Sequence, residues 1–149
     1  GVVAIGQDVF AWNDTVEEVY MPTTLKTIDD GAFFYCENLQ AVHLNDGLEK
    51  IGFRAFYYNS KLKSITIPES VVEIAEDGIL GPHLTDVYYE GTAAEWEDAV
   101  TSISVDSYED LTIHTSDLVF KQQDVYYDDY DEQMEEDFYN EDESMLPVG

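Results

Sequence analysis

The feature that most constrains this chain is an apolar pattern that repeats every 23 residues. The stretch "LKTIDDGAFFYCENLQAVHL" at residues 25–44 returns as "LEKIGFRAFYYNSKLKSITI" at residues 48–67, with the apolar letters kept and the others changed. Six apolar columns share this period, among them Ile5, Ile28, Ile51 and Ile74, and also Phe10, Phe33, Phe56 and Ile79. Such regularity indicates a fold in which every unit meets the next in the same way.

A single unit of 23 residues cannot bury its own apolar face, so units of this kind stack and cover one another. The segments "AVHL" and "SITI" alternate apolar and polar residues, as short half-buried strands do. We therefore predict a leucine-rich repeat solenoid, mainly β, in which each turn adds a short strand to a parallel sheet. Phe33 and Phe56, which follow the small residues Ala32 and Ala55, should fill its core.

The repeat unit resembles that of the BspA-like leucine-rich repeat family of bacterial surface proteins. The segments that carry the resemblance are "IPESVVEIAEDGI" and "LKTIDDGAFFYCENLQAV". Three residues depart from the family pattern, with Asn45 and Asp46 where proline is usual and Ile79 where phenylalanine is usual. The resemblance implies a solenoid and a cell-surface or extracellular location. The chain itself shows no signal-peptide pattern, so this expected location rests on the resemblance. It carries no catalytic or ligand-binding motif.

The pattern divides the chain into three parts. Residues 1–91 hold four 23-residue repeats, residues 92–117 form a C-terminal cap, and residues 118–149 form an acidic, tyrosine-rich tail. Thr92 and Glu95 have the spacing of a capping box, which predicts a helix over residues 93–100. Trp96 and Val100 share one face of that helix and should cover the open end of the stack. The alternation in residues 110–116 predicts a final strand.

Charge excludes several classes of partner. The chain has 33 acidic and 6 basic residues, a net charge of −27. Such a surface repels the phosphates of nucleic acid and of anionic membranes, and no apolar run approaches the roughly 20 residues that span a bilayer. We expect no nucleic-acid partner and no membrane insertion. The dense carboxylates of the tail permit weak calcium binding, and its apolar residues fit one helical stripe, namely Tyr127, Tyr130, Met134 and Phe138.

No arrangement of reactive residues in the sequence predicts catalysis. Cys36 is the single cysteine and occupies a repeat column with Asn13 and Asn59, which favours a buried structural residue over a catalytic thiol. No paired-cysteine or His-x-x-x-His spacing indicates a zinc site. We therefore expect a protein that is not an enzyme and that uses no cofactor or metal.

A rigid repeat scaffold without reactive residues favours a protein-binding module that serves adhesion or interaction. Two alternatives remain open: an acidic decoy or inhibitor of a basic partner, and a structural spacer. The candidate protein-binding face is the outward position of the repeated strand, occupied by Tyr20, His43, Thr66 and Tyr88. Tyrosine and histidine on a rigid face give large contact area at little entropic cost. The identity of the protein partner is not encoded in the pattern.

Overall fold

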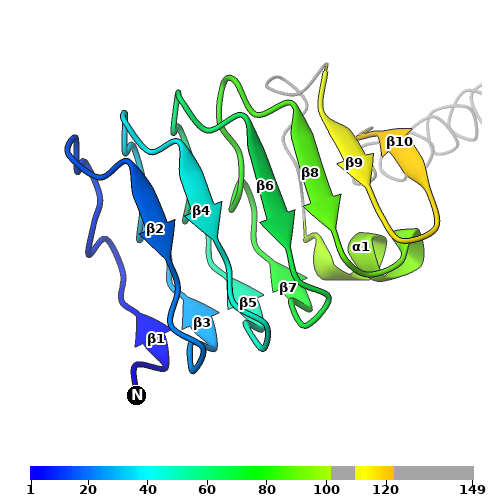
Figure 1. Cartoon of the computed structure of the whole chain (residues 1–149), viewed down its shortest axis with the longest axis horizontal. Coiled ribbons are helices and arrows are strands. Elements are labelled where there is room, and N and C mark those ends of the chain that lie inside the picture. The colour runs from blue at the N-terminus through cyan, green and yellow to red at the C-terminus, as the bar shows by residue number, and fades with distance from the viewer. Residues whose placement is uncertain (102–109, 123–149) are drawn as a thin grey trace, which may run out of the picture.

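The computed structural model describes residues 1–101 and 110–122, which form a β-solenoid of about four turns. Each of these turns gives one strand to each of two sheets (Figure 1). Sheet A is parallel and holds β1 (Ala4–Ile5), β3 (Thr27–Ile28), β5 (Lys50–Ile51) and β7 (Glu73–Ile74). Sheet B holds β2 (Glu18–Tyr20), β4 (Ala41–His43), β6 (Ser64–Ile67), β8 (Asp86–Tyr89), β9 (Thr112–His114) and β10 (Val119–Lys121). The predicted leucine-rich repeat solenoid is confirmed.

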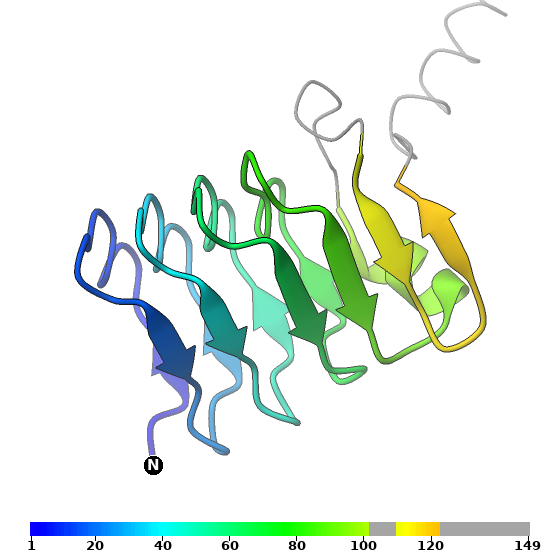
Figure 2. The ribbon, with the colours of Figure 1, turned by 45° about the horizontal axis from the view of Figure 1, so that its top comes forward.

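The register of the strands follows the sequence period. In sheet A, Ile5 pairs with Ile28, Ile28 with Ile51, and Ile51 with Ile74. One turn of the solenoid therefore corresponds to one repeat of the sequence. The strands of sheet B lie side by side from β2 to β10, and both views show the turns in chain order along the long axis (Figures 1 and 2).

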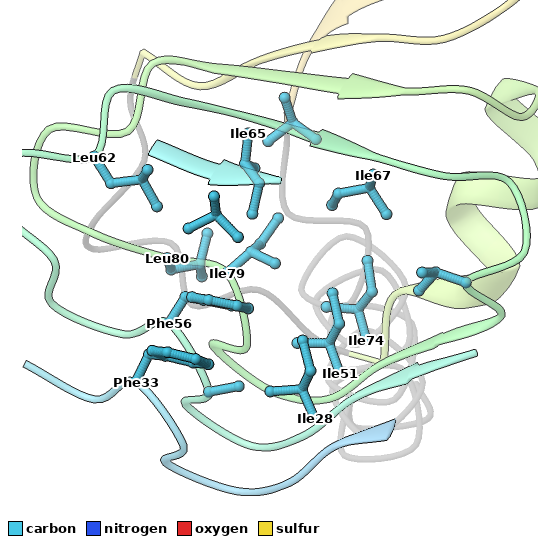
Figure 3. Packing of buried hydrophobic residues seen from close by; sticks show 14 of the residues in the cluster. Ile28, Phe33, Ile51, Phe56, Leu62, Ile65, Ile67, Ile74, Ile79 and Leu80 are labelled. Carbon is cyan, nitrogen blue, oxygen red and sulfur yellow. The ribbon is translucent and has the colours of Figure 1, made fainter. Parts of the chain in front are cut away.

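The core lies between the two sheets and the segments that connect them, and it is built from the apolar columns. Phe33 and Phe56 are 1% and 0% exposed, and their rings stack with centroids 5.1 Å apart and planes within 4°. Ile28, Ile51 and Ile74 form a second row beside these rings (Figure 3). The sequence prediction that Phe33 and Phe56 fill the core is confirmed.

The first turn exposes the same columns that the second turn buries. Val2 is 56% exposed while Leu25, one period later, is fully buried, and Phe10 is 39% exposed while Phe33 is buried. These side chains are exposed because, among the described residues, no turn packs against the outer side of β1 and β2. Neighbouring turns, and not local sequence, therefore decide the burial of each column.

The opposite end of the stack is covered by a cap. Helix α1 (Ala93–Ala99) begins at a complete capping box, in which the Thr92 side chain accepts from the Glu95 backbone N–H and the Glu95 side chain accepts from that of Thr92. Trp96 is 1% exposed and packs on Tyr89 of the last repeat. Strand β9 lies within residues 110–116, where a strand was predicted, and extends sheet B in parallel. Strand β10, which lies in the segment assigned to the tail, then folds back antiparallel to β9.

Several sequence predictions concern residues that the structure does not describe. The acidic tail beyond Gln122 lies outside the described residues. This applies to the stripe of Tyr127, Tyr130, Met134 and Phe138, and to weak calcium binding by the tail carboxylates.

Candidate functional site

The candidate residues stand in one row on the outer side of sheet B. Strand pairing places Tyr20 beside His43, His43 beside Thr66, and Thr66 beside Tyr88. The row continues onto the cap, where His114 lies beside Tyr88. We call these five outward side chains the strand face. Tyr20 and Tyr88 are 70% and 44% exposed, so their rings are accessible to a partner.

The first half of the strand face is a hydrogen-bonded cluster of Glu18, Tyr20 and His43. The Tyr20 hydroxyl donates to Oε1 of Glu18 at 2.8 Å, and Nε2 of His43 lies 2.7 Å from the same oxygen. The tyrosine and imidazole rings stack with centroids 4.2 Å apart and planes within 8°. The hydrogen bond with His43 lowers the pKa of Glu18, and the hydrogen bond to Glu18 raises the pKa of Tyr20.

A second cluster repeats this arrangement further along the sheet. Nε2 of His114 lies 2.9 Å from Oδ1 of Asp86, and the Tyr88 ring stacks on the His114 ring at 4.4 Å and 17°. Thr85 donates from its hydroxyl to the other carboxylate oxygen at 2.7 Å. The hydrogen bond with His114 is the main cause of a lowered pKa of Asp86. In both clusters the acid precedes its tyrosine by two residues, and the histidine comes from the next strand.

Between the clusters, sheet B is locally opened. Strands β4 and β6 are paired only at His43 and Thr66, whereas β6 and β8 pair over four positions. A depression of about 340 Å³ lies at this opening. It is lined by residues of β4 and β6 and of the positions beside them, namely Gln40, Ala41, Val42, His43, Leu44, Ser64, Ile65 and Thr66. The strand face is therefore a row of side chains with a depression near its centre.

A further exposed surface lies outside the strand face, on the segments that join β1 to β2, β3 to β4 and β5 to β6. Trp12, Tyr35 and Tyr58 form a column, in which the Trp12 ring packs tilted on Tyr35 at 4.5 Å and the Tyr35 ring stacks on Tyr58 at 5.2 Å. All three have positive φ, between 56° and 65°, which is unusual for bulky side chains and costs free energy. Mutual stacking of the rings offsets part of that cost.

The single cysteine of the chain lies in the core and not on the strand face. Cys36 is fully buried, and burial raises the pKa of its thiol, which disfavours the reactive thiolate. Its backbone N–H donates to Oδ1 of Asn59 at 2.8 Å, so the column of Cys36 and Asn59 is structural, as predicted. In the described ranges, no three His, Cys, Asp or Glu side chains are grouped as metal ligands.

Sequence reasoning found four members of the row and missed the fifth. His114 follows Tyr88 by 26 residues, because the capping helix interrupts the period of 23. The available signal was the alternation of residues 110–116, which turns His114 outward. The hydrogen bonds to Glu18 and Asp86, and the opening between β4 and β6, follow from side-chain and strand geometry that the repeat pattern does not encode.

Together the fold and the strand face define a repeat protein whose turns present a continuous, accessible sheet surface. A family model of the BspA type leucine-rich repeat region matches residues 3–116 in six copies, so the chain belongs to that family. No curated protein and no solved structure matched the chain. Repeats of this family generally serve as non-enzymatic scaffolds for protein interaction or adhesion, and its proteins are typically secreted or on the surface. No helix in the described ranges is both long and apolar enough to cross a membrane.

Proposed function

We propose that this chain is a non-enzymatic protein-binding module that contacts its partner through the strand face. One observation carries the proposal: two exposed tyrosine–histidine stacks stand on a rigid sheet, on either side of a depression. Aromatic side chains that are already ordered lose little entropy on binding, and a central hollow accepts an anchoring side chain.

The proposal includes an adhesive or interaction role at the surface of a bacterial cell or in its secretions. Support for this location comes from the usual setting of BspA-type proteins.

A binding assay with face variants tests the proposal. A partner is captured from a bacterial culture and from host-cell surfaces with the immobilised chain, and retention is compared for Tyr20→Ala, Tyr88→Ala and the double variant. The matched control is Tyr58→Ala, because Tyr58 is 43% exposed, close to the 44% of Tyr88, and lies outside the strand face. Loss of the partner in the double variant, with retention in the control and unchanged melting, supports the proposal. Equal retention in all variants argues against the strand face.

The net charge of −27 favours one second candidate, an acidic decoy that occupies a basic partner. The two functions differ in their dependence on salt. A decoy held by long-range charge should lose its partner steeply as ionic strength rises, whereas a partner anchored on aromatic rings should be retained.

A further inference from the structure

The two clusters of the strand face have the chemistry of sites for basic side chains. Each places a carboxylate beside an exposed tyrosine ring, and an arginine or lysine side chain can pair with the first while it lies over the second. Both side-chain hydrogen bonds to Glu18 end on Oε1, so within the described residues Oε2 keeps its lone pairs for a further donor. The lowered pKa values of Glu18 and Asp86 keep both carboxylates charged at neutral pH.

The separation of the clusters matches an extended chain. The first begins on β2 and the second on β8, three strand steps along sheet B. Three steps amount to about 14 Å at the usual spacing of hydrogen-bonded strands. An extended segment advances about 3.3 Å per residue, so about four residues span this distance. Residues four apart in such a segment also point to the same side, so both reach the sheet.

The depression lies where the middle residue of such a segment would point. The residue midway between the two that are four apart faces the same side as they do, and it stands over the opening between β4 and β6. Val42 and Ile65 are buried on the inner side of the sheet, so the depression presents mainly polar groups, among them those of Gln40, Ser64 and Thr66. This lining suits a small polar side chain, which finds hydrogen-bond partners at the rim.

The charges near the strand face favour a basic partner, and they predict which of the two clusters binds a basic side chain more strongly. The chain carries a net charge of −27, so a basic segment is attracted from a distance. Lys121 on β10 is close enough to Asp86 to contribute to its lowered pKa, and it repels an incoming cation there. Glu18 has no such neighbour among the causes of its shift, so the first cluster should bind the basic side chain more strongly.

We propose that the strand face binds an extended protein segment with two basic side chains four residues apart and a small polar side chain midway between them. The basic side chains occupy the two clusters, and the small polar side chain enters the depression. This proposal rests on the proposed function and specifies the chemistry of the partner.

Synthetic peptides of one composition test the spacing. Each carries two arginines in a serine–threonine background, with the arginines two, four or six residues apart. Binding to the full chain is measured by calorimetry at low and at physiological salt. The peptide with arginines four apart should bind about fivefold more tightly than the other two peptides. Each of the other two can place only one arginine on a cluster, so one exposed ion pair is not formed. Equal affinity for all three spacings, or equal binding when glutamate replaces arginine, would overturn the proposal.

Variants of the chain locate the binding. Glu18→Gln and Asp86→Asn should each weaken binding of the best peptide about fivefold and abolish its advantage over the others. Glu37→Gln is the matched control, because Glu37 is an exposed acid outside the strand face. Weakening of the control to the same degree would show that net charge alone attracts the peptide, against the proposal.

The failure of this inference is distinguishable from failure of the proposed function. If a captured natural partner is lost in the Tyr20→Ala, Tyr88→Ala double variant but no arginine peptide binds, the strand face binds protein of another chemistry. If the natural partner is retained in the double variant and no peptide binds, both proposals fall together.

Discussion

Replacing Phe33 by alanine tests the assignment of the core column most directly. Phe33 is 1% exposed and its ring lies between those of Phe10 and Phe56, with both centroid distances 5.1 Å. Truncation of a buried phenylalanine typically costs about 3–5 kcal/mol, because lost burial adds to the cavity that remains. The two ring contacts place Phe33 toward the upper end of this range. A domain of this size is stable by about 5–15 kcal/mol, so the variant should lose a large part of its stability.

Phe10→Ala is the matched control, because Phe10 occupies the same column of the preceding turn. It is 39% exposed and, among the described residues, its ring stacks on that of Phe33, so its loss should cost only about 1–2 kcal/mol. Both variants are unfolded by urea and by heat, with circular dichroism as the signal. Phe33→Ala should lower the melting temperature by about 10 °C or more, and Phe10→Ala by a few degrees. Equal shifts for the two, or a Phe33→Ala shift of a degree or two, would refute the column assignment.

Three further predictions concern the cap, the second cluster and the tail. Thr92→Ala removes the capping box of α1 and should lower the free energy of unfolding in urea by about 1 kcal/mol. Thr92→Ser keeps the capping hydroxyl and should retain most of that stability. The pKa of Asp86 in the folded chain is lowered from its ordinary value of 3.8, so its ionised carboxylate stabilises the fold at pH values above 3.8. This stabilisation is lost as the pH falls through the lowered pKa, so Asp86→Asn should destabilise the chain at neutral pH and not in strong acid. Deletion of residues 124–149 should leave cooperative melting intact, since the apolar columns end before them.

The architecture was predictable because burial in a solenoid depends on periodic positions. Each of Ile28, Ile51 and Ile74 pairs with the isoleucine at the same position of the preceding turn. The repeated apolar pattern therefore determines both the strand register and the core. The capping helix was predictable for a different reason, since Thr92 and Glu95 satisfy each other's backbone groups within four residues. Strand β10 was not predictable, because Val119 and Lys121 are exposed and only Phe120 packs on the core.

The candidate site was predictable only as a row of positions. Alternation turned Tyr20, His43, Thr66 and Tyr88 outward, and strand pairing places them side by side. Which side chains touch within the row depends on rotamers and on the spacing between strands. The contact of His43 with Glu18 joins residues 25 positions apart, and no local pattern selects it over a contact with solvent. The same holds for the reduced pairing between β4 and β6.

The buried core and the proposed binding face lie on opposite sides of the same strands, so residues of the face can be replaced with little effect on the core. On β4, Val42 points inward and is buried, while His43 points outward and is exposed. Replacing an outward residue removes few packing contacts, so its effect on stability should be small compared with that of an inward one. Tyr20, at 70% exposure, meets this condition better than Tyr88, whose ring is more covered beside His114. Loss of binding in Tyr20→Ala with unchanged melting is therefore attributable to the face itself, and Glu18→Gln then separates the contribution of its carboxylate from that of the ring.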